Sequence, residues 1–206
     1  MNQNHTDFCS SPEWGDYLRD EILPWVLGGR VLGDSVLEVG PGPGLTTELL
    51  RHKTDRLTVV EADGPTAGQL TQRFAGTNVT VVHADAGAMP LRAGRFSSAV
   101  ALTMLHHVPS TTAQDRVLSE IRRVLRPGCW LMGEDSTDDP DFREFHRGDV
   151  CVPLDPATLE ARLLAAGFTN PEVELGDHVV RFAALRPHTG LGRSAANAGP
   201  EKGPDR

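Results

Sequence analysis

The sequence predicts a single α/β domain built on a doubly wound sheet whose strands are mainly parallel. After Gly28-Gly29, short apolar runs alternate with segments of helical periodicity. This alternation is typical of a parallel sheet that helices cover on both faces. A chain of 206 residues is long enough for one full core and too short for two domains of ordinary size.

Composition limits the classes of partner. The formal net charge is −8 and no cluster of Lys and Arg stands out, which argues against a nucleic-acid substrate held by a broad basic face. The three cysteines are far apart and form no CxxC pair, so neither a disulfide framework nor a zinc site is expected. No basic-then-apolar leader opens the chain, and no apolar run approaches the roughly 18–20 residues of a membrane span. We therefore expect a cytoplasmic protein with no nucleic-acid or membrane partner.

The amino-terminal segment is expected to begin loosely and then become helical. Residues 1–10 are polar, whereas Ser11 and Pro12 have the pattern of a helix cap followed by a first helical residue. Pro24 should bend or end this helix, because proline donates no backbone hydrogen bond.

The strands and helices that follow are read from apolar runs and cap signals. A helix is expected over 111–125, and another begins at Asp155-Pro156 and stops at Gly167. The segment 134–152 between them is acidic and is expected to be irregular, and the tail 187–206 is expected to be disordered. The expected strands are 36–39, 57–61, 79–83, 96–102, 129–133, 172–175 and 179–185.

Three alternating glycines connect the first strand to a helix. Gly40, Gly42 and Gly44 follow Glu38, and each glycine removes a side chain that would keep a bulky nucleotide-like ligand away from the backbone. A dinucleotide-binding loop has the pattern G-x-G-x-x-G, but Leu45 stands where its third glycine would be. The lysine that a phosphate-binding P-loop requires is also missing.

Two acidic residues accompany the glycines. Glu61 ends the second expected strand, where a carboxylate can accept hydrogen bonds from both ribose hydroxyls of a nucleoside. Asp85-Ala86 follows the third expected strand. Nicotinamide enzymes share the first of these acids, so Glu61 supports a nucleoside ligand without separating the two classes of enzyme.

The Glu38-x-Gly40-x-Gly42-x-Gly44 pattern resembles motif I of the class I S-adenosylmethionine-dependent methyltransferases. With Asp85, with Leu105-His106-His107 and with Arg126-Pro127-Gly128, the chain looks like the ubiquinone/menaquinone-methyltransferase-like (type 11) branch of that family, over roughly residues 34–186. The resemblance implies a Rossmann-like sheet of seven strands, the last of them antiparallel. The chain departs from the family at Ser97, where Asp is common, and at Cys129, where a glycine is usual; we expect altered local packing there.

The resemblance also implies a cofactor, S-adenosylmethionine, and its contacts. The glycine loop would lie along the cofactor, Glu61 would bind the ribose, Asp85 with Ala86 would bind the adenine, and the backbone near Leu102-Thr103 would bind the amino-acid end. Glu38 is expected to anchor the loop. The full set of expected cofactor-binding residues is Glu38, Gly40, Pro41, Gly42, Gly44, Glu61, Ala62, Asp85, Ala86, Leu102 and Thr103.

Acceptor binding and catalysis have weaker signals. His106 and His107 follow the fourth expected strand, where a neutral histidine can act as a general base, although hydrogen-bonded support of the loop is the commoner role. His146 is a further candidate for catalysis or for orienting the acceptor. The other expected acceptor-binding residues are Trp14, Tyr17, Glu134 and Asp135. No metal is expected, because adjacent histidines do not easily face one ion and no ligand spacing supports them.

These features predict an S-adenosylmethionine-dependent methyltransferase that acts on a small molecule, on O or N rather than C or S, by direct in-line transfer. A non-catalytic domain that binds the cofactor for regulation stays open as an alternative, and a nicotinamide-dependent oxidoreductase is disfavoured by Leu45 and by the segment at Asp85. We expect a monomer or homodimer with a helical lid at 1–30, a methyltransferase domain at 31–186 and a tail at 187–206.

Overall fold

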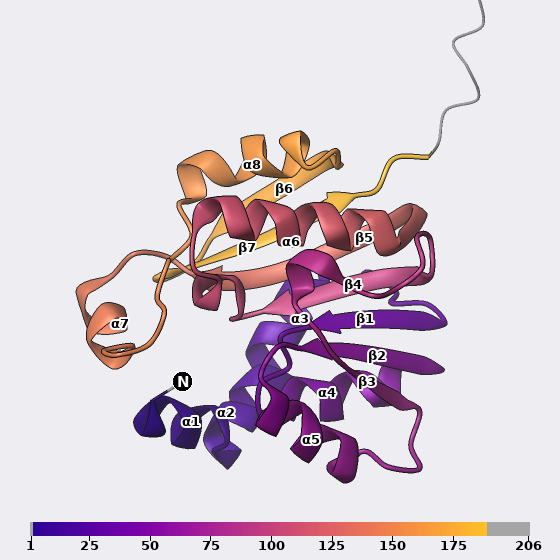
Figure 1. The fold of residues 1–206 in the computed structure, drawn as a ribbon. Coiled ribbons are helices and arrows are strands. Elements are labelled where there is room, and N and C mark those ends of the chain that lie inside the picture. The colour runs from indigo at the N-terminus through magenta and orange to yellow at the C-terminus, as the bar shows by residue number, and fades with distance from the viewer. Residues whose placement is uncertain (1, 189–206) are drawn as a thin grey trace, which may run out of the picture.

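The computed structural model describes residues 2–188 and contains one seven-stranded sheet with the order β3-β2-β1-β4-β5-β7-β6 (Figure 1). Strands β1 to β5 are parallel to one another, and β7 is antiparallel to both β5 and β6. The predicted fold, including the antiparallel last strand, is confirmed. The tail expected at 187–206 lies outside the described residues from position 189 onward. The strands are β1 (Ser35–Val39), β2 (Arg56–Glu61), β3 (Val79–His83), β4 (Phe96–Leu102), β5 (Leu125–Ser136), β6 (Thr169–Leu175) and β7 (Val179–Leu185).

Hydrophobic side chains on the two faces of the sheet form two cores. One core joins Leu37 of β1 and Leu131 of β5 to helices α6 (Thr111–Val124) and α8 (Pro156–Ala165). The other joins the alternate residues Val36 and Met132 to the amino-terminal helices and to α4 (Leu45–Leu50). The central strands are apolar on both faces because helices cover both sides, as expected for a parallel sheet. Helix α5 (Gly64–Arg73) and the short turns η2 (Arg51–Lys53), η3 (Ala86–Ala88) and η4 (Leu105–His107) complete the connections.

The amino-terminal segment is more ordered than the sequence suggested. The segment 1–10 that we expected to be loose contains α1 (Gln3–Cys9), which Asn2 caps by accepting a hydrogen bond from the His5 N–H group. Ser11 caps α2 (Pro12–Tyr17) as predicted. The helix does not end at Pro24: a π-helical turn, η1 (Leu18–Ile22), leads directly into α3 (Leu23–Leu27), which contains the proline and ends at Gly28.

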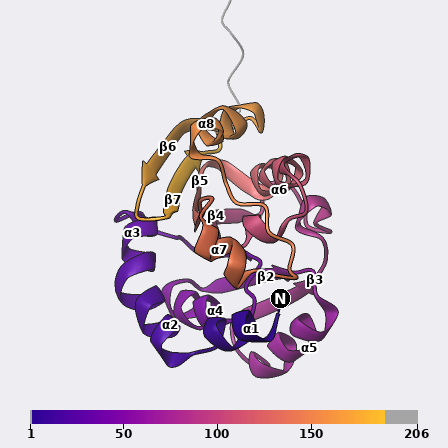
Figure 2. The same ribbon diagram turned by 90° about the vertical axis from the view of Figure 1, so that its left-hand side faces the viewer.

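The expectation of irregular structure over 134–152 is also wrong in part. Strand β5 continues to Ser136, three residues beyond the predicted end, because β7 pairs with it along this stretch. Helix α7 (Pro140–Phe145) follows and is capped by Asp139, whose side chain accepts hydrogen bonds from the N–H groups of Asp141 and Phe142. In both ribbon views α7 lies beside α1, at the same edge of the molecule (Figures 1 and 2).

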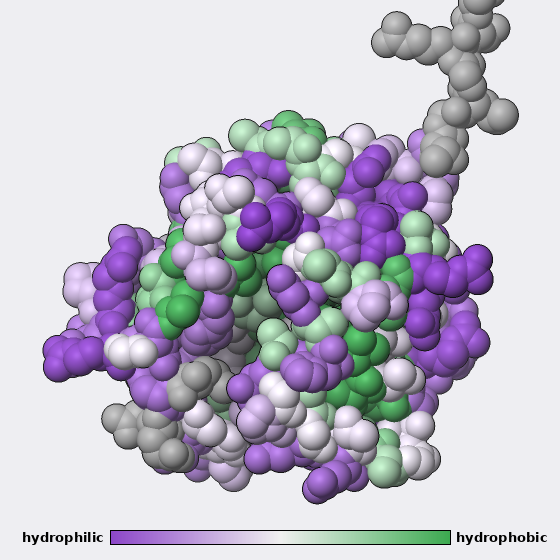
Figure 3. All heavy atoms as spheres, viewed as in Figure 1, coloured by the Kyte–Doolittle hydropathy of each residue, from purple (hydrophilic) through white to green (hydrophobic). Residues whose placement is uncertain are grey.

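The two departures from the family pattern are accommodated locally. The hydroxyl of Ser97 donates to the Leu32 and Ser35 carbonyl groups and accepts from the Ser35 N–H group. Cys129 is half-buried against the core on the α6 face. The visible surface is largely hydrophilic, with hydrophobic residues in separate groups (Figure 3). Among the described residues, no helix has the length and apolar character needed to cross a bilayer.

Candidate functional site

The three glycines of the loop after β1 have left-handed backbones, with φ of 66° at Gly40, 51° at Gly42 and 86° at Gly44. A Cβ atom at Gly40 would lie 2.6 Å from Met104 Cβ, and one at Gly44 would lie 2.6 Å from Leu70 Cδ2. A Cβ at Gly42 would meet no atom of residues 2–188 within 4 Å. Gly40 and Gly44 therefore allow the loop to pack against the protein, whereas the side of Gly42 on which a side chain would lie is open space.

Glu38 ties this loop to the helix that follows it. Its side chain is buried, and the Thr47 hydroxyl of α4 donates a 2.7 Å hydrogen bond to its Oε2. Burial raises the pKa of Glu38 to about 8, and the nearby Glu61 adds to the shift. The residue links β1 to α4 through this hydrogen bond.

Two carboxylates lie at the carboxyl ends of neighbouring strands. Glu61 ends β2 in register with His83 of β3, and its Oε1 accepts a 2.8 Å hydrogen bond from the Asp63 N–H group. Asp85 follows β3, is exposed, and accepts a 2.8 Å hydrogen bond from the Gly87 N–H group. These bonds order the turns that carry the acids. The loop, Glu61 and Asp85 thus share the edge at which ligands bind in doubly wound sheets.

The backbone at the end of β4 completes this edge. Thr103 has a φ of 47°, and its N–H group donates to the Glu134 carbonyl oxygen at 2.9 Å. Leu102 is buried in the core, so only backbone at this position is available to a polar ligand. Ala62 is exposed and Ala86 half-buried beside the two acids.

His106 and Asp135 form a buried pair on the α6 face of the sheet. His106 Nδ1 lies 2.6 Å from Asp135 Oδ1, and Asp135 Oδ2 accepts from the Leu105 N–H group at 2.6 Å. Burial alone would raise the pKa of Asp135, but His106 and the N–H groups of Ser136 and Leu105 hold it below its ordinary value. Asp135 therefore orients the His106 ring with its Nδ1 toward the carboxylate.

Three further histidines surround His106, and we refer to His5, His106, His107 and His146 as the histidine cluster. The ring centroid of His106 lies 4.0 Å from that of His107 and 4.8 Å from that of His146, and the centroids of His5 and His146 are 4.4 Å apart. Burial, reinforced by neighbouring imidazoles, lowers the pKa of His5 to about 4 and that of His107 to about 3. Burial also lowers the pKa of His146, so these three rings are neutral at pH 7.

The structure thus brings the three predicted catalytic histidines together and adds His5, which sequence reasoning missed. His5 lies in α1, and no local pattern marks a single histidine in a short polar helix as part of a distant cluster. Its position depends on tertiary contacts, including the 2.9 Å hydrogen bond from the Asn2 side chain to the Phe145 carbonyl oxygen.

The other expected acceptor-binding residues do not join this cluster. Glu134 lies on the opposite face of β5 from Asp135, because side chains alternate along a strand. It is buried, its Oε2 has no hydrogen-bond partner among the described residues, and burial beside Asp135 raises its pKa to about 8. The Trp14 and Tyr17 rings lie 5.8 Å apart on α2, and Tyr17 is exposed.

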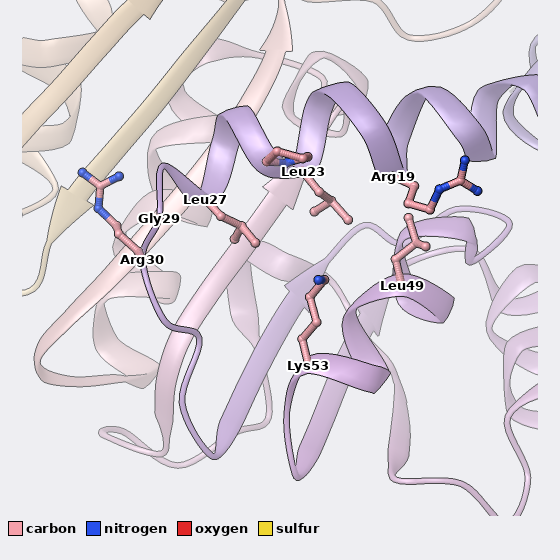
Figure 4. A pocket seen from close by; sticks show the side chains of 8 residues that line it. Arg19, Leu23, Leu27, Gly29, Arg30, Leu49 and Lys53 are labelled. Carbon is pink, nitrogen blue, oxygen red and sulfur yellow. The ribbon is translucent and has the colours of Figure 1, made fainter.

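A separate groove of about 400 Å³ lies between α3 and the α4–η2 segment (Figure 4). Its walls include the cationic residues Arg19, Arg30 and Lys53, with Leu23 and Leu49 between them. None of its lining residues belongs to the glycine loop or to the histidine cluster. The groove is therefore distinct from the candidate cofactor edge.

Comparison with known proteins agrees with this geometry. Residues 37–133 match the family model described as a methyltransferase domain. An uncharacterized methyltransferase of Mycobacterium tuberculosis (strain ATCC 25618 / H37Rv) is 31% identical over 116 residues, which cover 56% of this chain and 54% of that protein. A ribosomal RNA small subunit methyltransferase A of Erwinia tasmaniensis is 42% identical over 71 residues, which cover 34% of this chain and 25% of that protein. The chain therefore spans about half the length, or less, of these curated relatives.

Solved structures with the same fold cover more of the chain at lower identity. The DhpI–SAH complex is similar with a TM-score of 0.69 and 21% identity, over 89% of this chain and 90% of that chain. A chain of the Haloferax volcanii complex that contains the Trm112 methyltransferase activator gives a TM-score of 0.68 at 13% identity, over 91% of this chain and 100% of that chain. At such identities the similarity shows the fold alone.

The sheet order, the glycine loop and the family match together define a class I methyltransferase domain. Residues 37–133 match the methyltransferase domain, and the recognition of an S-adenosylmethionine-dependent methyltransferase domain made from the sequence is confirmed.

Proposed function

We propose that this protein transfers the methyl group of S-adenosylmethionine to an oxygen or nitrogen atom of a small molecule by direct in-line displacement. The observation that carries the proposal is the open side of Gly42, at the same sheet edge as Glu61 and Asp85. A loop of bare backbone beside two carboxylates on neighbouring strands fits a nucleoside with a charged amino-acid end.

The cofactor contacts follow from the order of the strands. Glu61 would bind the ribose hydroxyls, and Asp85 with the backbone of Ala86 would bind the adenine. The loop from Gly40 to Gly44, including Pro41, and the backbone at Leu102-Thr103 would bind the amino-acid end, with Glu38 beneath them as the anchor. S-adenosylmethionine supplies a methyl group on a positively charged sulfur, and the protein contributes chiefly by holding the acceptor in line with it.

A small acceptor is favoured over a nucleic acid by charge. The chain has a net charge of −8, whereas a protein that binds RNA through phosphates needs a basic surface. The match to the ribosomal RNA methyltransferase covers only 34% of this chain. Helices α1, α2 and α7 would enclose a small acceptor at the cofactor edge. If the acceptor must lose a proton, His106 is better placed to accept it than His107 or His146. Its Nδ1 atom lies 2.6 Å from the Asp135 carboxylate, which would stabilise the imidazolium, whereas the other two rings face backbone carbonyl groups.

Calorimetric titration with S-adenosylhomocysteine, S-adenosylmethionine and NADH tests the cofactor. Micromolar binding of both adenosyl ligands and no binding of NADH is expected, and binding of NADH alone would overturn the proposal. Screening small hydroxylated and amino compounds for release of S-adenosylhomocysteine then tests the activity. A protein that binds the cofactor and turns over none of the acceptors would favour the regulatory alternative.

A further inference from the structure

Four histidines from three separate segments face one another at the carboxyl edge of the sheet. One ring nitrogen of each member of the histidine cluster lies within 4.8 Å of one from every other member. His106 and His107 belong to η4, His146 follows α7 and His5 lies in α1. Helices α1 and α7, which are far apart in the sequence, approach each other here (Figure 2).

All four rings make their hydrogen bond through the same ring atom, Nδ1. In each ring the Nδ1 atom is directed at an oxygen that can only accept a hydrogen bond, so Nδ1 carries the proton of the neutral ring and Nε2 keeps its lone pair. In metal sites, a histidine ligand is oriented by the hydrogen bond that its other ring nitrogen, the one not bound to the metal, donates. The acceptors are Asp135 for His106 at 2.6 Å, the Phe142 carbonyl for His146 at 2.7 Å, the Val150 carbonyl for His107 at 3.2 Å and Asp149 for His5 at 3.4 Å.

Two of these lone pairs are buried without a partner. The Nε2 atoms of His106 and His146 have no hydrogen-bond partner among the described residues, and each of these residues is only 2% exposed. A buried acceptor that is left unpaired costs about 1–3 kcal/mol, and native structures contain few of them. The Phe142 ring, with its centroid 5.0 Å from that of His106, and the Phe145 ring beside His5 shield the cluster.

The surrounding charges suit a dication. The imidazoles themselves contribute no charge when neutral, whereas Asp135 and Asp149 place two carboxylates directly behind two of the rings. Two negative charges behind neutral ligands balance the charge of a divalent ion. Protonation of the rings cannot supply the same two positive charges, because two imidazolium groups at these distances would repel each other.

We propose that the histidine cluster binds one divalent transition-metal ion of the zinc class through four imidazole nitrogens. A tetrahedral zinc ion takes histidine nitrogens at about 2.0–2.1 Å and therefore places them about 3.3–3.4 Å apart. The ring nitrogens are at most 4.8 Å apart, so the widest pair has to approach by somewhat more than 1 Å to reach this spacing. Four protein ligands close the coordination sphere, as in structural zinc sites, so the ion fastens α1 and α7 to η4. Imidazole nitrogen also suits Co²⁺, Ni²⁺ and Cu²⁺.

Metal binding and base catalysis compete for the same Nε2 atom of His106. A general base needs one oriented imidazole, whereas here four imidazoles are oriented in the same way and converge. This common orientation favours the ligand role. The proposal departs from the sequence-based expectation of no metal, which rested on the adjacency of His106 and His107 and did not include His5 or the folding of α7 against α1. It does not depend on which acceptor is methylated.

The test is a metal titration of the full chain after treatment with a chelator. We expect one equivalent of Zn²⁺ to bind, and Co²⁺ to give the visible absorption bands of a four-coordinate ion. His5→Ala and His146→Ala should each weaken Co²⁺ binding at least about tenfold. His52→Ala is the matched control, because His52 is exposed on η2 outside the cluster, and it should bind Co²⁺ as the wild type does.

Circular dichroism and titration with S-adenosylhomocysteine on the same samples show whether each variant is folded. A folded wild-type protein that takes up no Zn²⁺ or Co²⁺ would overturn the proposal. So would cobalt spectra and affinities that are unchanged in both His5→Ala and His146→Ala. The titration with S-adenosylhomocysteine does not depend on the metal. A failure to bind metal therefore leaves the cofactor proposal standing, and a failure to bind S-adenosylhomocysteine leaves the metal proposal standing.

Discussion

Glu38 is a carboxyl group that the fold encloses and supports with a single side-chain hydrogen bond, from Thr47. Its pKa is raised to about 8 from 4.5, chiefly by burial. Between these two pH values the unfolded chain releases a proton that the folded chain keeps. The stabilisation is therefore full below about pH 4.5 and is lost as the pH rises toward 8, by about 1.4 kcal/mol per pH unit.

Glu38→Gln should remove this pH dependence, because the amide keeps an oxygen for Thr47 but does not titrate. Urea unfolding at pH 5, 6, 7 and 8 should show a smaller fall in the free energy of unfolding for the variant than for the wild type. The buried Glu134, whose pKa is also raised to about 8, contributes in the same direction and stays in both proteins. Parallel curves for the two proteins would show that Glu38 is ionised in the folded state.

Glu61 and Asp85 give the cofactor proposal a direct test. Glu61→Ala should weaken S-adenosylhomocysteine binding by about 1.5–3 kcal/mol, because charge-assisted hydrogen bonds to the ribose are lost. Asp85→Ala should selectively weaken the binding of ligands that contain an adenosyl group. Glu160→Ala, an exposed change on α8, should leave the calorimetric affinity unchanged. An unaltered affinity in Glu61→Ala would mean that the ribose lies elsewhere.

At the level of elements, the three glycines of the loop should separate into two kinds. Gly40→Ala and Gly44→Ala combine a left-handed backbone with a Cβ atom 2.6 Å from Met104 or Leu70, so both should destabilise the fold by several kcal/mol. The new methyl group of Gly42→Ala meets no atom within 4 Å in the described part of the chain, so its cost should be limited to about 1–2 kcal/mol of backbone strain. Its main effect should be weaker cofactor binding, measured by calorimetry on the folded variant. An equal loss of stability in all three variants would contradict the open space beside Gly42.

The elements that the sequence predicted well are those with strong local signals. Strands β3 and β4 have their expected bounds because β-branched and apolar runs stop sharply at polar residues. Helix α1 and the last part of β5 could not be predicted in the same way. A hydrogen bond from Asn2 holds α1 against Phe145, which is far away in the sequence, and β5 is extended because β7 pairs with its last residues. Such contacts leave no periodic pattern in the segment itself, which is also why His5 was missed.

At the level of the whole molecule, the amino-terminal segment divides into a covering part and a core part. The proposed lid spans 1–30, yet Leu18, Leu23 and Val26 lie in the core on the α4 face with at most 2% exposure. By contrast, Tyr17 is 53% exposed. We therefore expect only the part before Leu18 to behave as a cover for the acceptor, while 18–27 stabilises the sheet.

Leu23→Ala should lower the free energy of unfolding by about 2–5 kcal/mol, the usual cost of removing a large buried aliphatic side chain. The urea midpoint should fall with an unchanged m-value, because the native structure is weakened without a change in the surface that unfolding exposes. Tyr17→Ala should stay within about 0.5 kcal/mol of the wild type. If Leu23→Ala cost less than about 1 kcal/mol, or reduced only acceptor turnover, the whole amino-terminal segment would be a movable lid and the sheet would be stable without it.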